Sequence, residues 1–339
     1  MAGNSPTNWH VNTLLTNAAL VYPPGKYIAD FVSPRIMVDK SSDKVFKMLR
    51  KDITTPKNDL IGPNSKPSEV GYDTDEVTFT CADRGLTTRL PFKEIQDSDP
   101  IRDPRRRRLF HVMNMMALNH EIRVADLLDA SGSYASSNVI AAAAAWGNTT
   151  TGRPIEDIHN AINLLPGSDD GATQYKTVMA LEQSLFFKLI RHPDVRGLLG
   201  GNDRGLPNMA LIAEAFGLDE VHVSNADKNT AAEGATAVHA RIWDTDKARI
   251  LRVPVGTPDM PLTKDTSAFH ATFTQRFAGV PADVFQLAAD LSVEPFTVVQ
   301  EQHMPMEGGS LGTLMLKIAR CEDDSIVLQN DMGVLITGC

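Results

Sequence analysis

Cysteine is scarce in this chain, and the few that occur are widely separated. The 339 residues include 3 cysteines, Cys81, Cys321 and Cys339, and none has a second cysteine or a histidine at the short spacing used by zinc sites. An odd number of isolated cysteines also provides no disulfide framework. The sequence therefore predicts free thiols in a reducing compartment and argues against a zinc module.

Long hydrophobic runs and a secretory signal are also missing. Residues 1–10 are polar, and the longest mainly apolar stretch, near 139–146, is far shorter than the roughly 20 residues that cross a bilayer. We therefore expect no membrane partner. The formal charge of −9 argues against a protein whose main task is to grip nucleic acid, because such proteins carry a basic surface. It does not exclude a protein that encloses nucleic acid.

Motifs of catalysis are weak. The segment 308–312 reads Gly-Gly-Ser-Leu-Gly and matches the nucleophile elbow of hydrolases around Ser310, but a strand-like run follows it and no histidine occurs after His303. A glycine-rich turn between strands is the favoured interpretation. A serine hydrolase remains a minor alternative.

Sites for metals and phosphates are equally poorly supported. His111 and His120 are nine residues apart, which on a helix is a rotation of about 900° and places them on opposite faces. The Gly25-Lys26 pair lacks the earlier glycine of a P-loop, since Leu20 takes that position. The glycine-bearing loop 200–205 lies between two predicted helices rather than after a strand. We therefore predict no cofactor and no metal.

The first hundred residues contain few core-forming residues. Residues 1–40 are predicted to form an arm with a short helix near 12–21, ended by Pro23 and Pro24. Strand-like segments at 44–51 and 76–82 flank a polar stretch at 54–71 that is rich in proline and glycine. Because an isolated hairpin is marginally stable in water, we expect this long excursion to lie against another surface.

The clearest predicted element is a long helix. Asp103 places a capping acceptor before Pro104, and apolar residues then recur at three- and four-residue steps until Ser131-Gly132. About 27 residues at roughly 1.5 Å each give a helix about 40 Å long.

Shorter elements follow. Helices are predicted at 155–165, 176–190 and 208–216, and strands at 220–224, 240–243, 249–253, 296–300, 314–319, 325–328 and 334–337. The strands at 240–243 and 249–253 are expected to pair around Asp244. Helices and strands are segregated rather than alternating, so the predicted class is α+β.

A basic cluster opens the long helix. It consists of Arg102, Arg105, Arg106, Arg107 and Arg108. Cations at a helix N-terminus oppose the macrodipole, so their position costs stability unless an anion meets them. Three interpretations stay open: a solvated face, a contact with DNA, or a contact between subunits. For the last, the candidate acidic partners are Glu69, Asp73, Asp75, Glu76 and Asp83.

The order of these elements resembles the Hong Kong 97-type fold of major capsid proteins from tailed bacteriophages. An arm, a polar hairpin, a long helix, a mixed domain and a strand-rich tail follow one another in both. Local passages are similar as well: the Asp103-Pro104 start of an arginine-rich helix, then AAWG at 144–147 before RPIEDI at 153–158, then ALIAEAFGLDEVHV at 210–223. The resemblance covers nearly the whole chain.

The resemblance implies a structural role and a division of the chain. Residues 1–40 would form the N-terminal arm, 41–100 the extended loop, 101–165 the spine helix with part of the peripheral domain, 166–290 the axial domain, and 291–339 a return to the peripheral sheet. Copies would form pentamers and hexamers of an icosahedral virion shell around double-stranded DNA, assembled in the cytoplasm of a host bacterium.

The implied partners are further copies of the chain, a separate scaffolding protein and a portal, with a decoration protein as an optional addition. No lysine–asparagine pair stands out for a covalent cross-link between subunits. A nanocompartment shell of the same fold is the nearest alternative function.

Overall fold

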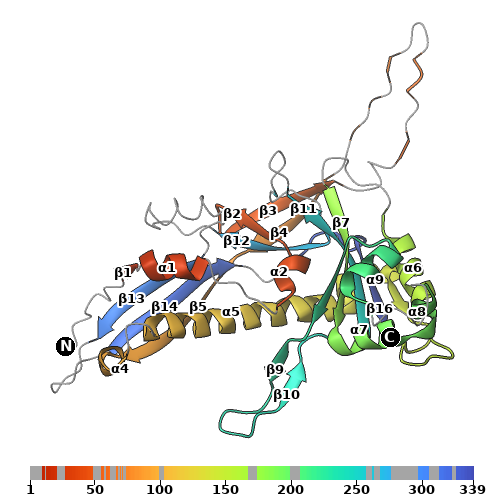
Figure 1. Cartoon of the computed structure of the whole chain (residues 1–339). Coiled ribbons are helices and arrows are strands. Elements are labelled where there is room, and N and C mark those ends of the chain that lie inside the picture. The colour runs from red at the N-terminus through yellow and green to blue at the C-terminus, as the bar shows by residue number, and fades with distance from the viewer. Residues whose placement is uncertain are drawn as a thin grey trace.

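The structure is a computed structural model, and it describes residues 10–11, 13–20, 27–48, 55–56, 59–61, 66–67, 69, 71, 74–98, 103–166, 174–198, 207–256, 262, 268–275, 297–304, 313–322 and 326–339. Two β-sheets lie at different places along one long helix, α5 (Pro104–Asp129), which runs through much of the molecule (Figure 1). Among the described residues, no helix is both long and apolar enough to cross a membrane.

The other helices are short. They are α1 (Thr13–Leu20), α2 (Ala29–Val32), α4 (Phe92–Gln96), α6 (Pro154–Leu164), α7 (Gln183–Arg191), α8 (Pro193–Leu198) and α9 (Met209–Phe216), with 3-10 turns at Ser131–Ser133 and Ser136–Asn138. The strands are β1 (His10–Val11), β2 (Arg35–Val38), β3 (Ser42–Met48), β4 (Thr74–Thr80), β5 (Ala82–Pro91), β6 (Val139–Ala141), β7 (Gln174–Glu182), β8 (Glu220–Ser224), β9 (Asp227–Asn229), β10 (His239–Arg241), β11 (Lys247–Val255), β12 (His270–Gln275), β13 (Thr297–Met304), β14 (Thr313–Glu322), β15 (Ile326–Val327) and β16 (Gly333–Thr337).

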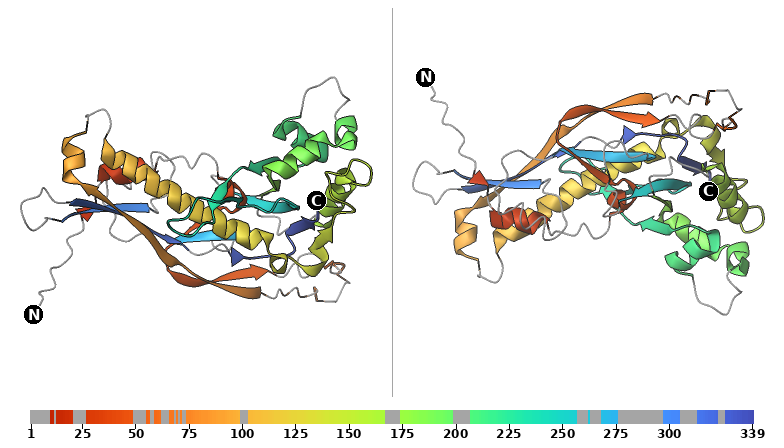
Figure 2. Two further views of the ribbon diagram at one scale, coloured as in Figure 1. Left: turned by 90° about the horizontal axis from the view of Figure 1, so that it is seen from below. Right: turned by 90° about the horizontal axis from the view of Figure 1, so that it is seen from above.

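The first sheet has seven strands and packs on the N-terminal half of α5. Its main path is β1-β13-β14-β12-β15, with β5 beside β14 and β2 beside β12. Leu109, Val112 and Met116 on α5 form a core with Leu316 and Ile318 of β14. Seen from below, α5 lies in front of these strands, and from above it lies behind them (Figure 2).

The second sheet has five strands in the order β6-β16-β11-β7-β8. One face packs on the C-terminal half of α5, where Val124 and Leu128 share a core with Leu251. The other face is covered by α6, α7 and α9, with Trp146 and Ile158 among the fully buried residues there. This part of the chain is therefore a three-layer structure with helices on both faces of a sheet.

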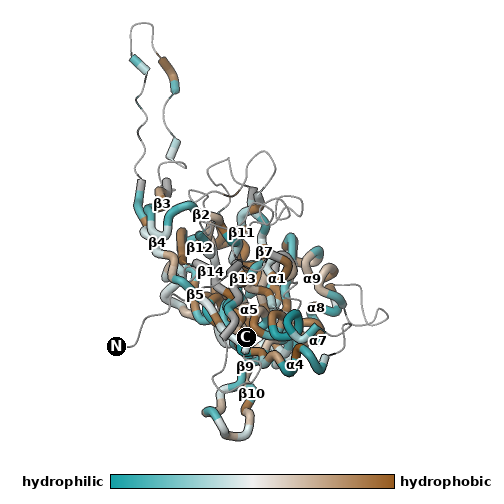
Figure 3. The backbone as a smooth tube through the Cα atoms, turned by 90° about the vertical axis from the view of Figure 1, so that its left-hand side faces the viewer, coloured by the Kyte–Doolittle hydropathy of each residue, from teal (hydrophilic) through white to brown (hydrophobic). Residues whose placement is uncertain are grey.

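Two antiparallel hairpins lie outside these sheets, on opposite sides of α5 (Figures 1 and 3). In the first, β3 pairs with β4 from Ser42 opposite Thr80 to Met48 opposite Thr74. In the second, β9 pairs with β10. The β3–β4 pair is attached to the seven-stranded sheet by a small core in which Phe79 stacks on Phe273 with ring centroids 4.4 Å apart.

The helix expected after Asp103 is confirmed. The Asp103 carboxylate accepts a hydrogen bond from the Arg105 N–H at 2.9 Å, and Pro104 occupies the first helical position. The helices expected at 155–165 and 208–216 are confirmed with small shifts. The second helix is capped by the Asn208 side chain. It ends before Gly217, whose φ of 67° is the left-handed conformation that glycine adopts easily.

The helix expected over 176–190 is wrong in its first half. Residues Gln174–Glu182 form β7, and the helix begins at Gln183. Because β7 lies between β11 and β8 and has helices on both faces, the run Val178, Met179, Ala180 and Leu181 is buried throughout and shows no alternation. A continuous apolar run of this kind does not distinguish a central strand from a helix.

The expected pairing around Asp244 is also wrong. Residues His239–Arg241 pair with β9, whereas β11 pairs with β7 and β16. The strands expected in the tail are present, but they are divided: β13 to β15 belong to the seven-stranded sheet and β16 to the five-stranded sheet. Since β16 pairs with β11, about 85 residues earlier in the chain, local sequence does not reveal its partner.

Candidate assembly surfaces and an arginine pocket

The basic cluster lies on the exposed first turns of α5. Arg106 and Arg107 are exposed, and the Arg106 guanidinium lies 5.7 Å from the centre of the Phe110 ring. Arg108 forms an ion pair of 3.2 Å with Glu94 of α4, and both side chains are more than two-fifths exposed. Arg102 lies outside the described residues. An exposed pair of this kind contributes at most about 1 kcal/mol, so the cluster does little to hold the subunit together.

The candidate acidic partners lie elsewhere in the subunit. Glu69, Asp75, Glu76 and Asp83 are exposed, and Asp73 lies outside the described residues. Glu76 forms an ion pair with Lys44 across the β3–β4 hairpin. Among the ion pairs formed by described residues, none joins these acids to the arginine cluster. Their pairing therefore stays a prediction about contacts between copies.

A set of exposed apolar side chains gathers on the helices of the five-stranded part, which we call the helical end. The set comprises Leu164, Phe187, Leu198, Met209 and Leu211, each 39–50% exposed. They come from the ends or outer faces of α6, α7, α8 and α9. Sequence reasoning missed this surface, although α9 carries apolar residues on more than one face, which is itself a signal. Exposed apolar side chains on neighbouring elements are typical of a surface that meets another protein.

Two further exposed apolar residues lie between β3 and β4. Leu60 is 82% exposed and Ile61 is 55% exposed. Neither belongs to a core formed by described residues of the same subunit. The excursion therefore carries apolar surface that remains open to solvent in a single copy.

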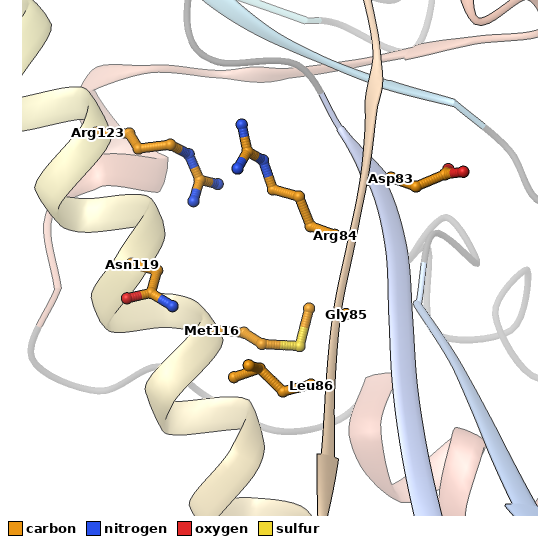
Figure 4. Close-up of a pocket in the computed structure, with 7 residues that line it drawn as sticks. All are labelled: Asp83, Arg84, Gly85, Leu86, Met116, Asn119 and Arg123. Atoms are coloured by element: carbon orange, nitrogen blue, oxygen red, sulfur yellow. The ribbon is translucent and has the colours of Figure 1, made fainter.

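A pocket of about 250 Å³ lies between α5 and β5. It is lined by Asp83, Arg84, Gly85, Leu86, Met116, Asn119 and Arg123. In Figure 4, Arg84 from the strand and Arg123 from the helix extend their guanidinium groups toward one another, whereas the Asp83 side chain points away. The lining includes two arginines and an amide but no nucleophile paired with a base, so it does not resemble a catalytic site.

Glu121 forms a buried polar centre on α5. Its carboxylate accepts hydrogen bonds from the Ala29 N–H at 2.7 Å and from the Trp243 indole N–H at 2.6 Å, with longer bonds from the Ile28 N–H and Ser224. Burial raises the pKa of this carboxyl, and these donors oppose the rise. The contacts tie α2, α5 and the loop before β11 together, which stabilises the junction between the two sheets.

A buried ion pair lies at the C-terminal end of α5. Arg249 of β11 is fully buried and pairs with Asp129, and its guanidinium lies 5.0 Å from the centre of the Trp243 ring. It also donates to the Lys247 carbonyl at 3.0 Å. Burial raises the pKa of Asp129, and the charge of Arg249 lowers it. Sequence reasoning missed the buried carboxylates of Asp129 and Glu121, because their partners lie far away in the chain. Asp244 is 115 residues from Asp129, and Trp243 is 122 residues from Glu121.

Similar proteins share both the sequence and the fold. No family model matches the chain. The chain is 28% identical over 245 residues to the major capsid protein of Pseudomonas phage JBD67, which covers 70% of this chain and 76% of the relative. The chain is therefore similar in sequence to the phage major capsid proteins. A crystal structure of a phage-related protein from Bordetella bronchiseptica RB50 superposes with a TM-score of 0.69 at 15% identity, covering 97% of this chain and 98% of the other.

The fold is the Hong Kong 97-type capsid fold that the sequence predicts. The same fold occurs in the SrpI encapsulin of Synechococcus elongatus PCC 7942, with a TM-score of 0.51 at 11% identity, covering 99% of this chain and 92% of the encapsulin. These similar proteins are capsid proteins and not enzymes, so the hydrolase alternative is set aside. Ser310 lies outside the described residues.

Proposed function

We propose that this capsid protein forms the pentamers and hexamers of an icosahedral phage head that encloses double-stranded DNA. The observation that carries the proposal is the apolar helical end, with Phe187 exposed on α7 and Met209 and Leu211 exposed on α9. Packing of copies around a symmetry axis removes this surface from water, and each Å² of apolar surface buried contributes about 25 cal/mol.

The proposed division of the chain follows the predicted order. Residues 1–40 are the arm, 41–100 the extended loop, 101–165 the spine helix with part of the peripheral domain, 166–290 the axial domain, and 291–339 the return to the peripheral domain. The continuous core beneath α6, α7 and α9 supports an axial unit, and the packing of β14 on α5 supports a peripheral one. Within the proposed return, β13 to β15 lie in the seven-stranded sheet, whereas β16 lies in the five-stranded sheet.

The excursion between β3 and β4 is the proposed clamp on a neighbouring copy. Its exposed Leu60 and Ile61 support this role, since contact with a neighbour buries them. Deletion of residues 54–72 is expected to leave a folded subunit that does not form closed shells, seen by electron microscopy and by sedimentation. Normal particles from the deletion variant would contradict the clamp.

A milder pair of variants separates contact from chain length. Replacing Leu60 and Ile61 together with serine is expected to slow or weaken shell formation without changing the melting temperature. Val238→Ser is the matched control, because Val238 is also an exposed apolar residue but lies on the β9–β10 hairpin. Equal assembly of all three proteins would show that the excursion does not act through these side chains.

The first experiment on the whole proposal is electron microscopy of the purified protein, expressed alone and then with its neighbouring phage genes. We expect closed shells or separate pentamers and hexamers. The second condition tests the proposed need for a scaffolding protein and a portal, and it reveals any decoration protein on the particles. A monomer under both conditions would refute the shell proposal. We further propose that assembly takes place in the cytoplasm of the host bacterium.

A nanocompartment shell is the second candidate, supported by the shared fold of the encapsulin. The contents of the particles distinguish the two functions. Nuclease-resistant double-stranded DNA inside particles made during phage growth supports the virion shell, whereas an enclosed enzyme and no DNA supports the compartment. The net charge of −9 favours a container from which DNA is released without adhering to the wall.

A further inference from the structure

We propose that the outer face of α5 binds the same face of a second copy of this chain, with the two helices antiparallel about a two-fold axis. The inference rests on the proposed shell, because an icosahedral assembly places its copies about two-fold axes, where the same surface of both copies meets. Seen from below, α5 lies in front of the seven-stranded sheet, and no other helix of the described part lies in front of it (Figure 2, left). The outer face of α5 is therefore open in a single copy.

This outer face is one continuous stripe, which we call the α5 stripe. It consists of Arg107, His111, Met115, Leu118, Ile122 and Asp126. Each residue of an α-helix is rotated by about 100° from the one before, so these six stay within an arc of about 100°. Met115 is 43% exposed at the centre of the stripe. Leu118 and Ile122 are half-buried, because they also pack against the core of the five-stranded sheet.

The α5 stripe is complementary to itself. The point midway between Met115 and Leu118 is also midway between Arg107 and Asp126. An antiparallel second copy in this register therefore places Met115 against Leu118, and it places Arg107 against Asp126 twice in each contact. A parallel second copy would instead place like charges opposite one another. Charge therefore selects the antiparallel arrangement and its register.

The two charged ends of the stripe cannot pair within one subunit. Arg107 and Asp126 are exposed, and 19 residues of helix keep them roughly 28 Å apart. Among the ion pairs that described residues form, none includes either of them. A cation at a helix N-terminus opposes the macrodipole, and the antiparallel copy brings both Asp126 and the negative end of its own helix to this position. The contact thus supplies the anion that the N-terminus of α5 needs.

The contact is small, and its strength depends on repetition. Its apolar part is limited to the centre of the stripe, so an isolated pair of copies is expected to be weak, as are protein contacts that bury little area. Helix axes that pack side by side lie about 8–10 Å apart, which leaves the long Arg107 side chain within reach of a facing carboxylate. The test therefore uses assembled particles rather than free dimers.

Exchanging the charges tests the register. Arg107→Asp and Asp126→Arg, each in the full-length chain, are expected to lower the particle yield at least about fivefold, because each places like charges opposite one another twice in every contact. The double variant restores opposite charges and should recover most of the yield. Arg106→Asp is the matched control, because Arg106 is exposed in the same turn but lies off the stripe, and its yield should stay near that of wild type. Circular dichroism checks that each variant folds.

A cross-linking measurement provides evidence that does not depend on yield. The photoreactive residue p-benzoylphenylalanine replaces Met115 in particles assembled from equal parts of isotopically labelled and unlabelled chains. We expect mass spectrometry to find links from position 115 to residues 118–122, including links that join a labelled peptide to an unlabelled one.

Three outcomes would overturn the contact. Particles that form equally well from all variants and show no such link would remove it and leave the shell proposal standing. A loss with Arg107→Asp that the double variant does not recover would show that this end of α5 meets DNA or another acidic surface instead. Wild-type protein that forms no particles under any condition would refute the shell and this contact together.

Discussion

The two ends of α5 use charge in opposite ways. At the N-terminal end, Arg106 and Arg107 are exposed, and the ion pair from Arg108 to Glu94 is open to solvent. At the C-terminal end, Asp129 and Arg249 form a pair in which the arginine is fully buried against Trp243. Buried charges of this kind belong to the fold, because breaking them leaves an unpaired ion in a low dielectric. Exposed charges at the other end are free to serve contacts between copies.

The largest expected effect comes from breaking the buried pair. Arg249→Met leaves the Asp129 carboxylate without its partner, and we expect the free energy of unfolding to fall by about 3–5 kcal/mol. Urea unfolding followed by circular dichroism measures the change. The double variant with Asp129→Leu should recover part of the loss, since it removes the orphaned charge as well. A single variant within about 1 kcal/mol of wild type would show that the pair is not structural.

A smaller loss is expected at the neighbouring buried carboxylate. Glu121→Gln places an amide N–H₂ group where only donors point, so we expect a loss of about 2 kcal/mol in the free energy of unfolding. Glu214→Gln on the exposed surface of α9 is the control and should change little. Equal stability of the two variants would mean that the polar centre at Glu121 contributes nothing measurable.

The pH dependence of stability should be governed in part by His270. Burial, together with the charge of His120, lowers the pKa of His270 from 6.5 to about 3. Below pH 6.5 this histidine is therefore protonated in the unfolded chain but stays neutral in the folded chain. The free energy of unfolding decreases as the pH is lowered through this range. The loss from this group between pH 7.5 and pH 5 is about 2 kcal/mol.

His270→Gln should remove that part of the pH dependence. Thermal unfolding at a series of pH values measures the change. His239→Gln is the control, because His239 is exposed and pairs with Asp227 on the β9–β10 hairpin. An unchanged slope in His270→Gln would show that another group governs the loss at low pH.

The smallest effect on stability is expected at the exposed end of α5. Replacing Arg105, Arg106 and Arg107 with glutamine should change the free energy of unfolding by no more than about 0.5 kcal/mol. If the cluster meets acids of a neighbouring copy or DNA, shell formation or DNA retention should nevertheless decline, as measured by electron microscopy and nuclease protection. The matched triple lysine variant keeps the charge and should assemble. Unchanged particles would leave the solvated face as the correct interpretation.

Sequence reasoning succeeded where the determinants are local. The long helix is recognisable because Asp103 and Pro104 mark its start and apolar residues repeat along one face as far as Leu128. It failed at β7, where burial on both faces removes the alternation that identifies a strand. It also named the exposed arginines but not Arg84 and Arg123, because their convergence depends on β5 lying beside α5.

The sequence by itself determined the α+β class, the order of the main elements and the family resemblance, since caps, turns and periodicity act within a few residues. The tertiary structure alone decided which charges are buried together, which strands share a sheet and which apolar residues remain exposed. Glu121 and Trp243 are 122 residues apart, and Arg249 and Asp129 meet only after α5 packs on β11. Such contacts depend on long-range packing, and no local pattern encodes the partner.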